Sequence, residues 1–531
     1  MPQNDQAPSF VPHSHWLHPP RLEDKNFGWT FLLAMTLVGA ALRLFELTGQ
    51  SLWVDELLTW QAIRPGSGLG FWVQVGDSIQ GPLYLAAIWP LVHLQDSALM
   101  MRLPAVVAGI LAVPLFGWLA FRTLGGRGAR LALLLFALNP FHIWYSQEAR
   151  GYAFLMLLAI VTALIYLAMV RRGPSPGWAV AFAVAGAAMV LSNMSGMFLL
   201  FAMALTVILV HRPERRAGWG WWLLAFGLAG VLVAPWLLKA SGIWAVDRIV
   251  PGAGTGEALR GETTFSLAAL PYAIYTFFFG YSLGPSLREL HQPDRMAVLL
   301  GYWPVLALGA GAVGVALLSS LGRMDRRRVA LLVWVLAPVL LLVILALRNV
   351  KPWNARYVAV VLPWLVLMAG AGLARLARWP GLIVTAVLAG LTLWSLGGYY
   401  GQEKYAKADL RQAAVLIGEA QPPGRVVLVP VVTAVFGYYD RGEHVLLNSY
   451  GQAPLRDRAA ASLFVTETLG GHDFCRVVLA RQWYLDPEGH LMQALSRVGH
   501  LRLESTVPGV SIYTWERKRT PAVGDESGMG L

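Results

Sequence analysis

Long apolar stretches constrain this sequence more than any other feature, because eleven of them approach the length that a helix needs to cross a membrane. Crossing about 30 Å of hydrocarbon takes about 20 helical residues. The expected spans are residues 27–47, 99–121, 129–145, 152–170, 178–193, 194–211, 219–238, 296–320, 329–347, 357–374 and 380–400. Hydrophobic residues make up 56% of the chain and charged residues 14%, which excludes a disordered, coiled-coil or nucleic-acid-binding protein. We therefore predict a polytopic α-helical membrane protein.

Short basic segments before and between these spans, mostly rich in arginine, predict the orientation of the chain, because cytoplasmic loops retain basic residues. These segments are the N-terminal residues 1–26 and the loops 122–130, 171–177, 211–218, 321–328 and 375–379. All of them fall on the cytoplasmic side if the apolar segment 82–94 does not cross and the segment 265–283 either does not cross or enters and leaves as a re-entrant pair. We place 265–283 in a long outer loop. The longer loops 48–98 and 239–295 then face outward. We expect a multi-pass protein of the inner (plasma) membrane whose first span is an uncleaved anchor.

After residue 400 the composition changes to alternating helix and strand patterns with an ordinary share of charge. Residues 405–419 and 487–498 predict helices. Strand-like runs cover residues 425–431, 443–447, 475–480, 500–506 and 510–515. We therefore divide the chain into a transmembrane domain at 27–400, a small extracytoplasmic α/β soluble domain at 401–518 and a disordered tail at 519–531.

Two groups of acidic residues are expected on the outer side of the membrane. Asp55 and Glu56 follow Trp53 in the first outer loop, and Glu148 lies with Arg150 in the short connection between the third and fourth spans. Ionisable groups at the membrane are costly and therefore often functional. Spacing alone leaves a second interpretation open, in which the carboxylates are solvated and Trp53 anchors the chain at the interface.

Together with the residues around them, these clusters resemble the membrane glycosyltransferases of the GT-C superfamily. The branch that they resemble (glycosyltransferase family 39-like) contains protein O-mannosyltransferases and the aminoarabinose transferases that modify lipid A. The matching stretches are Leu42-Arg43-Leu44, Trp53-Val54-Asp55-Glu56, Gly81-Pro82-Leu83-Tyr84, Met101-Arg102-Leu103-Pro104, Gly125-Gly126-Arg127-Gly128-Ala129, Asn139-Pro140-Phe141-His142, Ser146-Gln147-Glu148-Ala149-Arg150 and Asn354-Ala355-Arg356-Tyr357. The resemblance covers roughly residues 30–400 and is strongest over 40–155. Gly81 stands where many relatives have a further proline.

The resemblance implies a GT-C fold of about 11 spans with outer-surface helices. It also implies the transfer of a single sugar, with inversion, from a polyprenyl-phosphate donor to an acceptor on the extracytoplasmic face. Phosphate is a good leaving group, so this reaction needs a carboxylate to take the acceptor proton and cations to hold the phosphate. The resemblance gives the role of general base to Asp55, and an inverting displacement needs one base opposite the leaving group.

The roles of the other two acids are left open. Glu56 supports Asp55, contacts the acceptor or is solvated, because adjacent side chains on a helix point about 100° apart. Glu148 hydrogen-bonds the sugar or the acceptor, or it joins Asp55 in binding a divalent metal, since some members of the superfamily use one. Hard cations need several oxygen ligands. We therefore expect no tight metal site and no firmly implied cofactor.

Further polar residues are candidates for binding the donor and the acceptor. The donor phosphate is expected to contact Arg150, Arg102, Arg356 and Lys351, because basic side chains match phosphate oxygens. For each of these except Arg150, contact with lipid headgroups is the simpler explanation. The sugar or the acceptor is expected to contact Tyr84, Tyr281, Ser282 and Arg288, although the glycine and serine near these last three also form ordinary turns.

A transporter or flippase of lipid-linked sugars is the main alternative, because it also needs many spans and a site for an anionic ligand. Transporters commonly bind substrate near the midplane between repeated halves, whereas the polar residues here gather at one face beside an outer domain. We expect a protein, lipid or envelope-glycan acceptor, contact with membrane lipids and no nucleic-acid partner. The sugar and the acceptor are not predicted, because the shape of the pocket sets specificity.

Overall fold

The computed structural model describes residues 28–518 with several gaps. The residues left out are 66–69, 77, 79, 214–215, 242–264, 292–293, 323–324, 349, 352, 421–424, 431, 448–456, 483–485 and 487. The expected N-terminal segment 1–26, the expected tail 519–531 and much of the outer loop 239–295 therefore lie outside the described residues.

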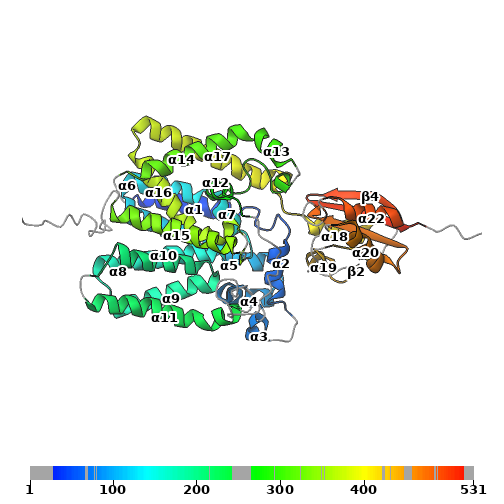
Figure 1. Cartoon of the computed structure of the whole chain (residues 1–531), viewed down its shortest axis with the longest axis horizontal. Coiled ribbons are helices and arrows are strands. Elements are labelled where there is room, and N and C mark those ends of the chain that lie inside the picture. Colours follow the sequence, from blue (N-terminus) through cyan, green and yellow to red (C-terminus); the bar gives the residue numbers. More distant parts are fainter. Residues whose placement is uncertain are drawn as a thin grey trace, which may run out of the picture.

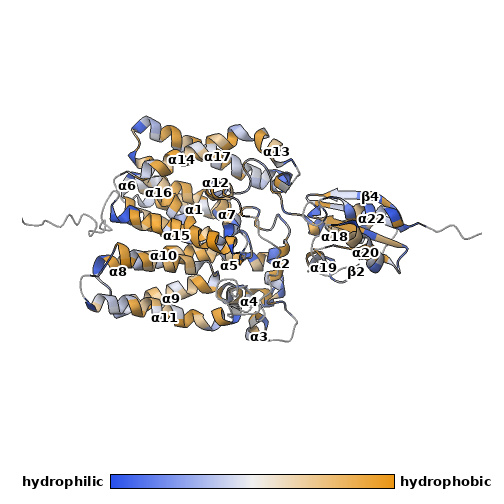
Figure 2. Ribbon diagram, viewed as in Figure 1, coloured by the Kyte–Doolittle hydropathy of each residue, from blue (hydrophilic) through white to orange (hydrophobic). Residues whose placement is uncertain are grey.

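A bundle of apolar helices forms the larger part of the molecule (Figures 1 and 2). Its long helices are α1 (Trp29–Leu44), α5 (Ala98–Leu124), α8 (Tyr152–Arg172), α9 (Pro176–Ser192), α10 (Gly196–Leu209), α11 (Arg216–Ser241), α14 (Trp303–Ser320), α15 (Arg326–Leu347), α16 (Leu362–Arg375) and α17 (Arg378–Gly401). Among the described residues, seven helical segments are long and apolar enough to cross a membrane, and α1, α9 and α10 are shorter apolar helices. The predicted α-helical membrane fold is confirmed.

Two of the expected spans are broken into separate helices. Residues 129–145 form α6 (Gly126–Ala137) and α7 (Pro140–Ser146). The break occurs because the Asn139 side chain caps α7, accepting a 2.8 Å hydrogen bond from the backbone N–H of His142, and because proline favours the first position of a helix. Residues 296–320 likewise form α13 (Arg295–Gly301) and α14. The prediction of one continuous helix is wrong for each of these segments.

Short helices lie at the end of the bundle that faces the C-terminal sheet (Figure 1). They include α2 (Val54–Gln61), α3 (Phe71–Gly76) and α4 (Pro82–Leu94). The 13 residues of α4 extend only about 20 Å, less than the thickness of the hydrocarbon layer. The second apolar segment that was expected not to cross, 265–283, contains α12 (Ala269–Phe279), which with 11 residues is shorter than α4. Both belong to the same group of shorter apolar helices as α1, α9 and α10, so the prediction that neither segment crosses stays a prediction.

The C-terminal part contains a five-stranded sheet in the order β2-β1-β3-β5-β4. Its elements are α18 (Leu410–Glu419), β1 (Val426–Leu428), α19 (Thr433–Asp440), β2 (Val445–Leu447), α20 (Arg458–Leu469), β3 (Phe474–Ala480), α22 (His490–Val498), β4 (Gly499–Val507) and β5 (Val510–Arg517). β1 pairs in parallel with β2 and β3, while β5 pairs antiparallel with β3 and β4. All five expected strands form, whereas α19 and α20 were not predicted.

The C-terminal part packs directly on α2. Val54 and Leu57 of α2 are buried in one hydrophobic core with Leu410 of α18 and Phe436 of α19. The Ser51 hydroxyl donates a 2.7 Å hydrogen bond to the carbonyl of Ala408, just before α18. The sheet region therefore helps to position the helix that carries Asp55 and Glu56.

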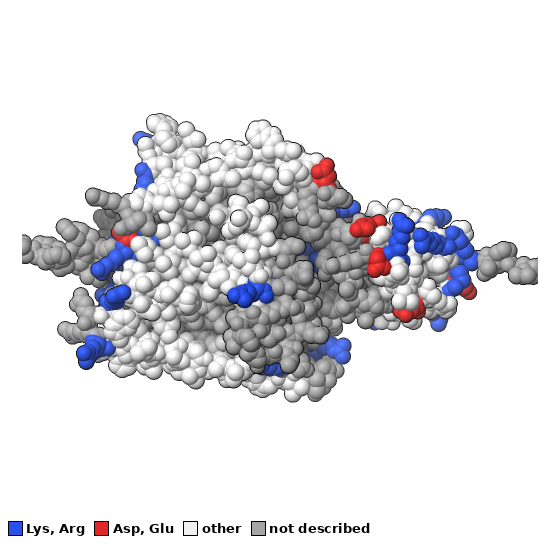
Figure 3. Space-filling model, in the orientation of Figure 1, with Lys and Arg blue, Asp and Glu red and all other residues white. Residues whose placement is uncertain are grey.

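Basic side chains gather at the opposite end of the bundle (Figure 3). Arg171 at the end of α8 donates to the carbonyl of Arg122 at 2.8 Å, and Arg375 at the end of α16 donates to that of Ser320 at 2.9 Å. The loops predicted to be cytoplasmic from their arginines thus meet at one end, away from the C-terminal sheet.

Candidate functional site

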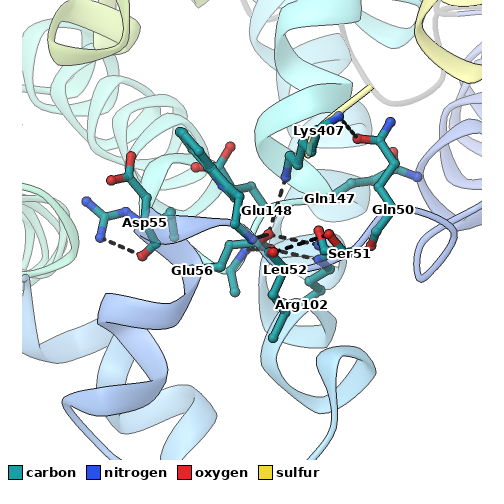
Figure 4. A network of polar contacts seen from close by, with 12 residues as sticks. Gln50, Ser51, Leu52, Asp55, Glu56, Arg102, Gln147, Glu148 and Lys407 are labelled. Carbon is teal, nitrogen blue, oxygen red and sulfur yellow. Dashed lines mark hydrogen bonds and ion pairs between the residues drawn. The ribbon is translucent and has the colours of Figure 1, made fainter. Parts of the chain in front are cut away.

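The helix α2 presents its two acidic residues to different surroundings. Asp55 and Glu56 lie in its first turn, where the helix dipole stabilises carboxylates. Figure 4 shows that Glu56 lies with Arg102 and Lys407, whereas Asp55 lies away from that group. Adjacent residues of one sequence motif therefore serve two separate environments.

Glu56 is fully buried in a closed network. Its carboxylate accepts hydrogen bonds from Arg102 at 2.7 and 2.8 Å, from the backbone N–H of Ala149 at 2.9 Å and from Lys407 at 3.3 Å. Burial alone would raise the pKa of Glu56, but Arg102 and Lys407 outweigh burial and lower it to about 2. Of the three open roles for Glu56, the structure favours support of its neighbour. It leaves Glu56 neither solvated nor exposed to an acceptor.

Arg102 lies outside the cavity that Asp55 lines. Besides its two bonds to Glu56, its guanidinium donates to the carbonyls of Leu47 at 2.8 Å, Gln50 at 3.0 Å and Ser51 at 3.1 Å. The side chain is 1% exposed, and it does not line the cavity beside Asp55. Arg102 instead fastens the start of the outer loop to α5, and this geometry argues against the expected phosphate contact.

Asp55 faces a cavity of about 570 Å³. Its carboxylate forms an ion pair with Arg356, and Arg150 donates to its backbone carbonyl at 3.3 Å. Burial would raise the pKa of Asp55, but the charges of Arg356 and Arg150 outweigh burial and hold it below its ordinary value. Asp55 is therefore ionised at neutral pH.

The cavity combines cations, hydroxyls and an apolar wall. Its basic lining residues are Arg64, Arg150, Lys351 and Arg356, and Asp55 is the single acidic residue among the described residues that line it. Its neutral polar lining includes Gln80, Tyr84, Tyr152, Ser192, Asn193, Ser195 and Tyr357, and Phe198, Trp236 and Leu342 form part of the apolar wall. The structure thus brings together Asp55, Arg150, Lys351, Arg356 and Tyr84 from the predicted site.

Glu148 lies close to this cavity without lining it. It is fully buried, and its Oε2 accepts a 3.0 Å hydrogen bond from the indole of Trp144. Its Oε1 has no hydrogen-bond partner among the described residues. Burial raises the pKa of Glu148 to about 7, with Glu56 and Asp55 adding to the rise against the opposing charge of Lys407. Glu148 therefore belongs to the same electrostatic group as Asp55.

The remaining predicted residues lie outside the Asp55 cavity. The Tyr281 and Tyr145 hydroxyls are 2.9 Å apart, and Ser282 is buried. Arg288 lines a separate cavity, together with Arg481 and Asp486 of the C-terminal part. The part of the chain that the structure describes holds no cluster of three or more His, Cys, Asp or Glu residues suited to a metal. A metal shared by Asp55 and Glu148 stays a prediction.

Sequence reasoning missed several residues of this site, above all Lys407. Its ammonium group lies 5.5 Å from the ring centres of both Trp53 and Trp144, besides its contact with Glu56. Arg64, Gln80 and Asn193 were also missed, because each lies outside the motifs that carry the resemblance. Lys407 offered one signal, since lysine is scarce in a chain whose basic residues are mainly arginine.

Comparisons with known proteins identify structures with a similar fold. No family model and no curated protein sequence matches the chain. ArnT from Cupriavidus metallidurans bound to undecaprenyl phosphate is similar in structure, with a TM-score of 0.53 and 13% identity over 92% of this chain and 98% of ArnT. The apo state of the same protein gives a TM-score of 0.54 and 14% identity over the same shares.

A second solved structure is the archaeal oligosaccharyltransferase AglB from Archaeoglobus fulgidus, in complex with an inhibitory peptide and a dolichol-phosphate. It gives a TM-score of 0.51 and 11% identity over 92% of this chain and 74% of AglB. Both proteins have the GT-C fold. The chain therefore has the GT-C fold that the sequence motifs predict, whereas the particular branch is not identified.

Proposed function

We propose that this chain, with its GT-C fold, is a membrane glycosyltransferase that moves one sugar from a polyprenyl-phosphate donor to an acceptor hydroxyl. The observation that carries the proposal is the cavity that Asp55 lines together with four basic side chains, with Asp55 as the single acidic residue among the described lining residues. Enzymes of this kind need one base for the acceptor and several cations for the phosphate. An apolar wall beside these cations suits the first units of a polyprenyl chain.

The proposed reaction moves negative charge from Asp55 to the phosphate. The acceptor oxygen attacks the anomeric carbon while its proton passes to the Asp55 carboxylate. The bond between the anomeric carbon and the phosphate oxygen breaks, and polyprenyl phosphate leaves with the electron pair. Asp55 becomes neutral as the leaving phosphate gains a charge, so Arg356 can exchange its partner from one to the other. Attack opposite the leaving group inverts the anomeric centre.

The cavity is proposed to open on the extracytoplasmic side of the membrane. The arginine-rich loops meet at the end of the bundle away from the C-terminal sheet (Figure 3), and basic loops remain in the cytoplasm. The opposite end, with α2 and the sheet, then faces outward. This side holds polyprenyl-linked sugars together with protein, lipid or envelope-glycan acceptors.

Replacing Asp55 with Asn tests the proposal, because Asn keeps the size of the side chain and removes its basicity. Purified protein is supplied with a panel of undecaprenyl-phosphate hexoses and pentoses plus an envelope extract, and released undecaprenyl phosphate is measured. Loss of a general base lowers the rate by about 10²–10⁴, so Asp55→Asn should fall by at least about 100-fold. Asp96→Asn is the matched control, since Asp96 is an exposed outer residue that accepts a 2.9 Å hydrogen bond from Trp60.

Two results would contradict this assignment. Asp55→Asn protein that retains more than about a tenth of wild-type turnover would show that Asp55 is not the base. Wild-type protein that carries labelled donor across vesicle membranes without releasing undecaprenyl phosphate would favour the transporter alternative.

A further inference from the structure

A second cavity lies at the arginine-rich end of the bundle, away from Asp55. Its volume is about 290 Å³, and it is enclosed mainly by α5, α8, α14, α15 and α16. Its apolar lining includes Leu119, Leu331, Leu332, Trp334, Trp364 and Leu367. The proposed reaction uses none of these residues. Most of these helices are long and apolar enough to cross a membrane.

The dimensions of this cavity fit one hydrocarbon chain. Along α16 it reaches from Arg375 to Trp364, a separation of about 16 Å for eleven residues that each rise about 1.5 Å. A volume of about 290 Å³ spread over that length is a narrow channel. Trp334 and Trp364 close its deep end, with their ring centres 4.9 Å apart. The channel therefore suits a single extended acyl chain better than a compact ligand.

The mouth of the cavity carries a net positive charge. Arg327, Arg328 and Arg375 line it, and Asp325 is the acidic residue among the described residues around it. Asp325 only partly offsets them, because its carboxylate lies 3.9 Å from Arg328 and is half exposed. The Nη1 of Arg328 is buried without a hydrogen-bond partner among the described residues. A buried guanidinium nitrogen of this kind normally has an acceptor.

We propose that this cavity binds one anionic phospholipid of the surrounding leaflet. The lipid phosphate accepts hydrogen bonds from Arg328 and its neighbours Arg327 and Arg375, at the depth where lipid headgroups lie. One acyl chain fills the channel toward Trp364. Basic pockets between helices on the cytoplasmic side are suited to anionic headgroups, and a guanidinium fork matches phosphate oxygens. The lipid would join α15 to α16 at the end opposite Arg356.

Native mass spectrometry of the full-length protein tests the proposal. Detergent-purified protein is mixed with equal amounts of phosphatidylglycerol and phosphatidylcholine of the same chain length. We expect one phosphatidylglycerol to be retained in preference to phosphatidylcholine. Each basic residue near an anionic lipid contributes about 1 kcal/mol to the binding free energy, which is a factor of about five in affinity. The double variant Arg328→Gln/Arg375→Gln should therefore bind phosphatidylglycerol about 25-fold more weakly.

Two further variants distinguish specific binding in the cavity from nonspecific attraction to surface charge. Arg172→Gln removes a basic residue at the same end of the bundle that does not line the cavity and lies 5.8 Å over the Trp178 ring. It should retain the lipid as the wild type does. Ala371→Phe places a ring in the channel without changing charge, and it should release the lipid. Thermal unfolding in lipid-free detergent checks that each variant is folded.

Three outcomes would overturn the proposal. Equal retention of phosphatidylglycerol and phosphatidylcholine would show that the basic mouth selects nothing. Equal loss of lipid in Arg172→Gln and in the double variant would show a diffuse charge effect. Displacement of the bound phosphatidylglycerol by one equivalent of undecaprenyl phosphate would assign the cavity to the carrier lipid instead.

Discussion

Arg356 is expected to control the basicity of Asp55 as well as donor binding. Its guanidinium pairs with the Asp55 carboxylate. Burial raises the pKa of Asp55, and the charges of Arg356 and Arg150 bring it below its ordinary value. Arg356→Gln removes one of these charges, so the pKa of Asp55 should rise. Asp55 would then stay protonated up to a higher pH. The acid limb of the pH profile of kcat should therefore shift to higher pH.

Two variants complete this measurement. Arg356→Lys keeps the charge but loses the planar fork, so its acid limb should stay near that of the wild type while the KM for the donor rises. Arg411→Gln is the control, because Arg411 of α18 donates to the carbonyls of Thr48 and Gly49 outside the cavity. An acid limb in Arg356→Gln that matches the wild type would show that a group other than Asp55 titrates.

Glu148 is expected to make stability depend on pH. Burial raises its pKa to about 7, whereas an unfolded glutamate has a pKa of about 4.3. Between these values the folded protein holds a proton that the unfolded chain has released, so the free energy of unfolding falls as pH rises through this window. Glu148→Gln keeps an oxygen for the Trp144 indole and removes the titration.

At pH 8, the free energy of unfolding of Glu148→Gln should therefore exceed that of the wild type by on the order of a few kcal/mol, and the variant should unfold at a higher temperature. At pH 5 the difference should shrink to about 1 kcal/mol, because Glu148 is then neutral in the folded protein and only the unfolded chain has released most of its proton. Tryptophan fluorescence during heating in detergent measures both. A difference of the same size at both pH values would refute the titration.

At the scale of elements, Lys407 connects the C-terminal part to the site. It follows η4 (Glu403–Tyr405) and reaches Glu56 at 3.3 Å, between the rings of Trp53 and Trp144. Lys407→Met keeps much of the packing but removes the charge, and Glu56 retains Arg102 as a partner. We expect a loss of about 1–3 kcal/mol in stability and a lower kcat, because α2 is less firmly positioned.

Lys404→Met is the matched control for this prediction. Lys404 lies three residues earlier and donates a 3.0 Å hydrogen bond to the Tyr302 hydroxyl at an exposed position. Its loss should change stability and kcat little, since exposed contacts contribute little. If Lys404→Met and Lys407→Met lose stability and kcat equally, the network around Glu56 does not position α2.

Local signals in the sequence predicted the elements better than the contacts between them. Apolar length was enough to find the membrane helices, yet it hid the break at Asn139-Pro140, where a capping residue and a proline gave a local signal. The motif around Asp55 pointed to a residue that lines the cavity. The separation of Glu56 from Asp55 depends on Arg102 and Lys407, which are 46 and 351 residues away in the chain. One sequence contains no direct measure of such distant pairs.

For the whole molecule, the orientation in the membrane is the property on which the proposed function depends. Basic residues gather at one end of the bundle, and the Asp55 cavity lies toward the other (Figures 1 and 3). The helix α4 decides the orientation, because a crossing at this point would reverse every later loop. With 13 residues it extends about 20 Å, less than about 30 Å of hydrocarbon, but α10 with 14 residues is almost as short, so a labelling experiment rather than length must test whether α4 crosses.

Labelling of one introduced cysteine at a time in intact cells tests this orientation with little background, because the native Cys475 is buried. Exposed positions suitable for substitution are Gln95 and Gly471 on the expected outer side and Gly177 and Ala217 on the expected inner side. A membrane-impermeant thiol reagent should label Gln95→Cys and Gly471→Cys but not Gly177→Cys or Ala217→Cys. After the cells are permeabilised, all four should react. If Gln95→Cys and Gly471→Cys differ in intact cells, an odd number of crossings separates them. Their shared side with the Asp55 cavity, and with it the extracytoplasmic site, would then be wrong.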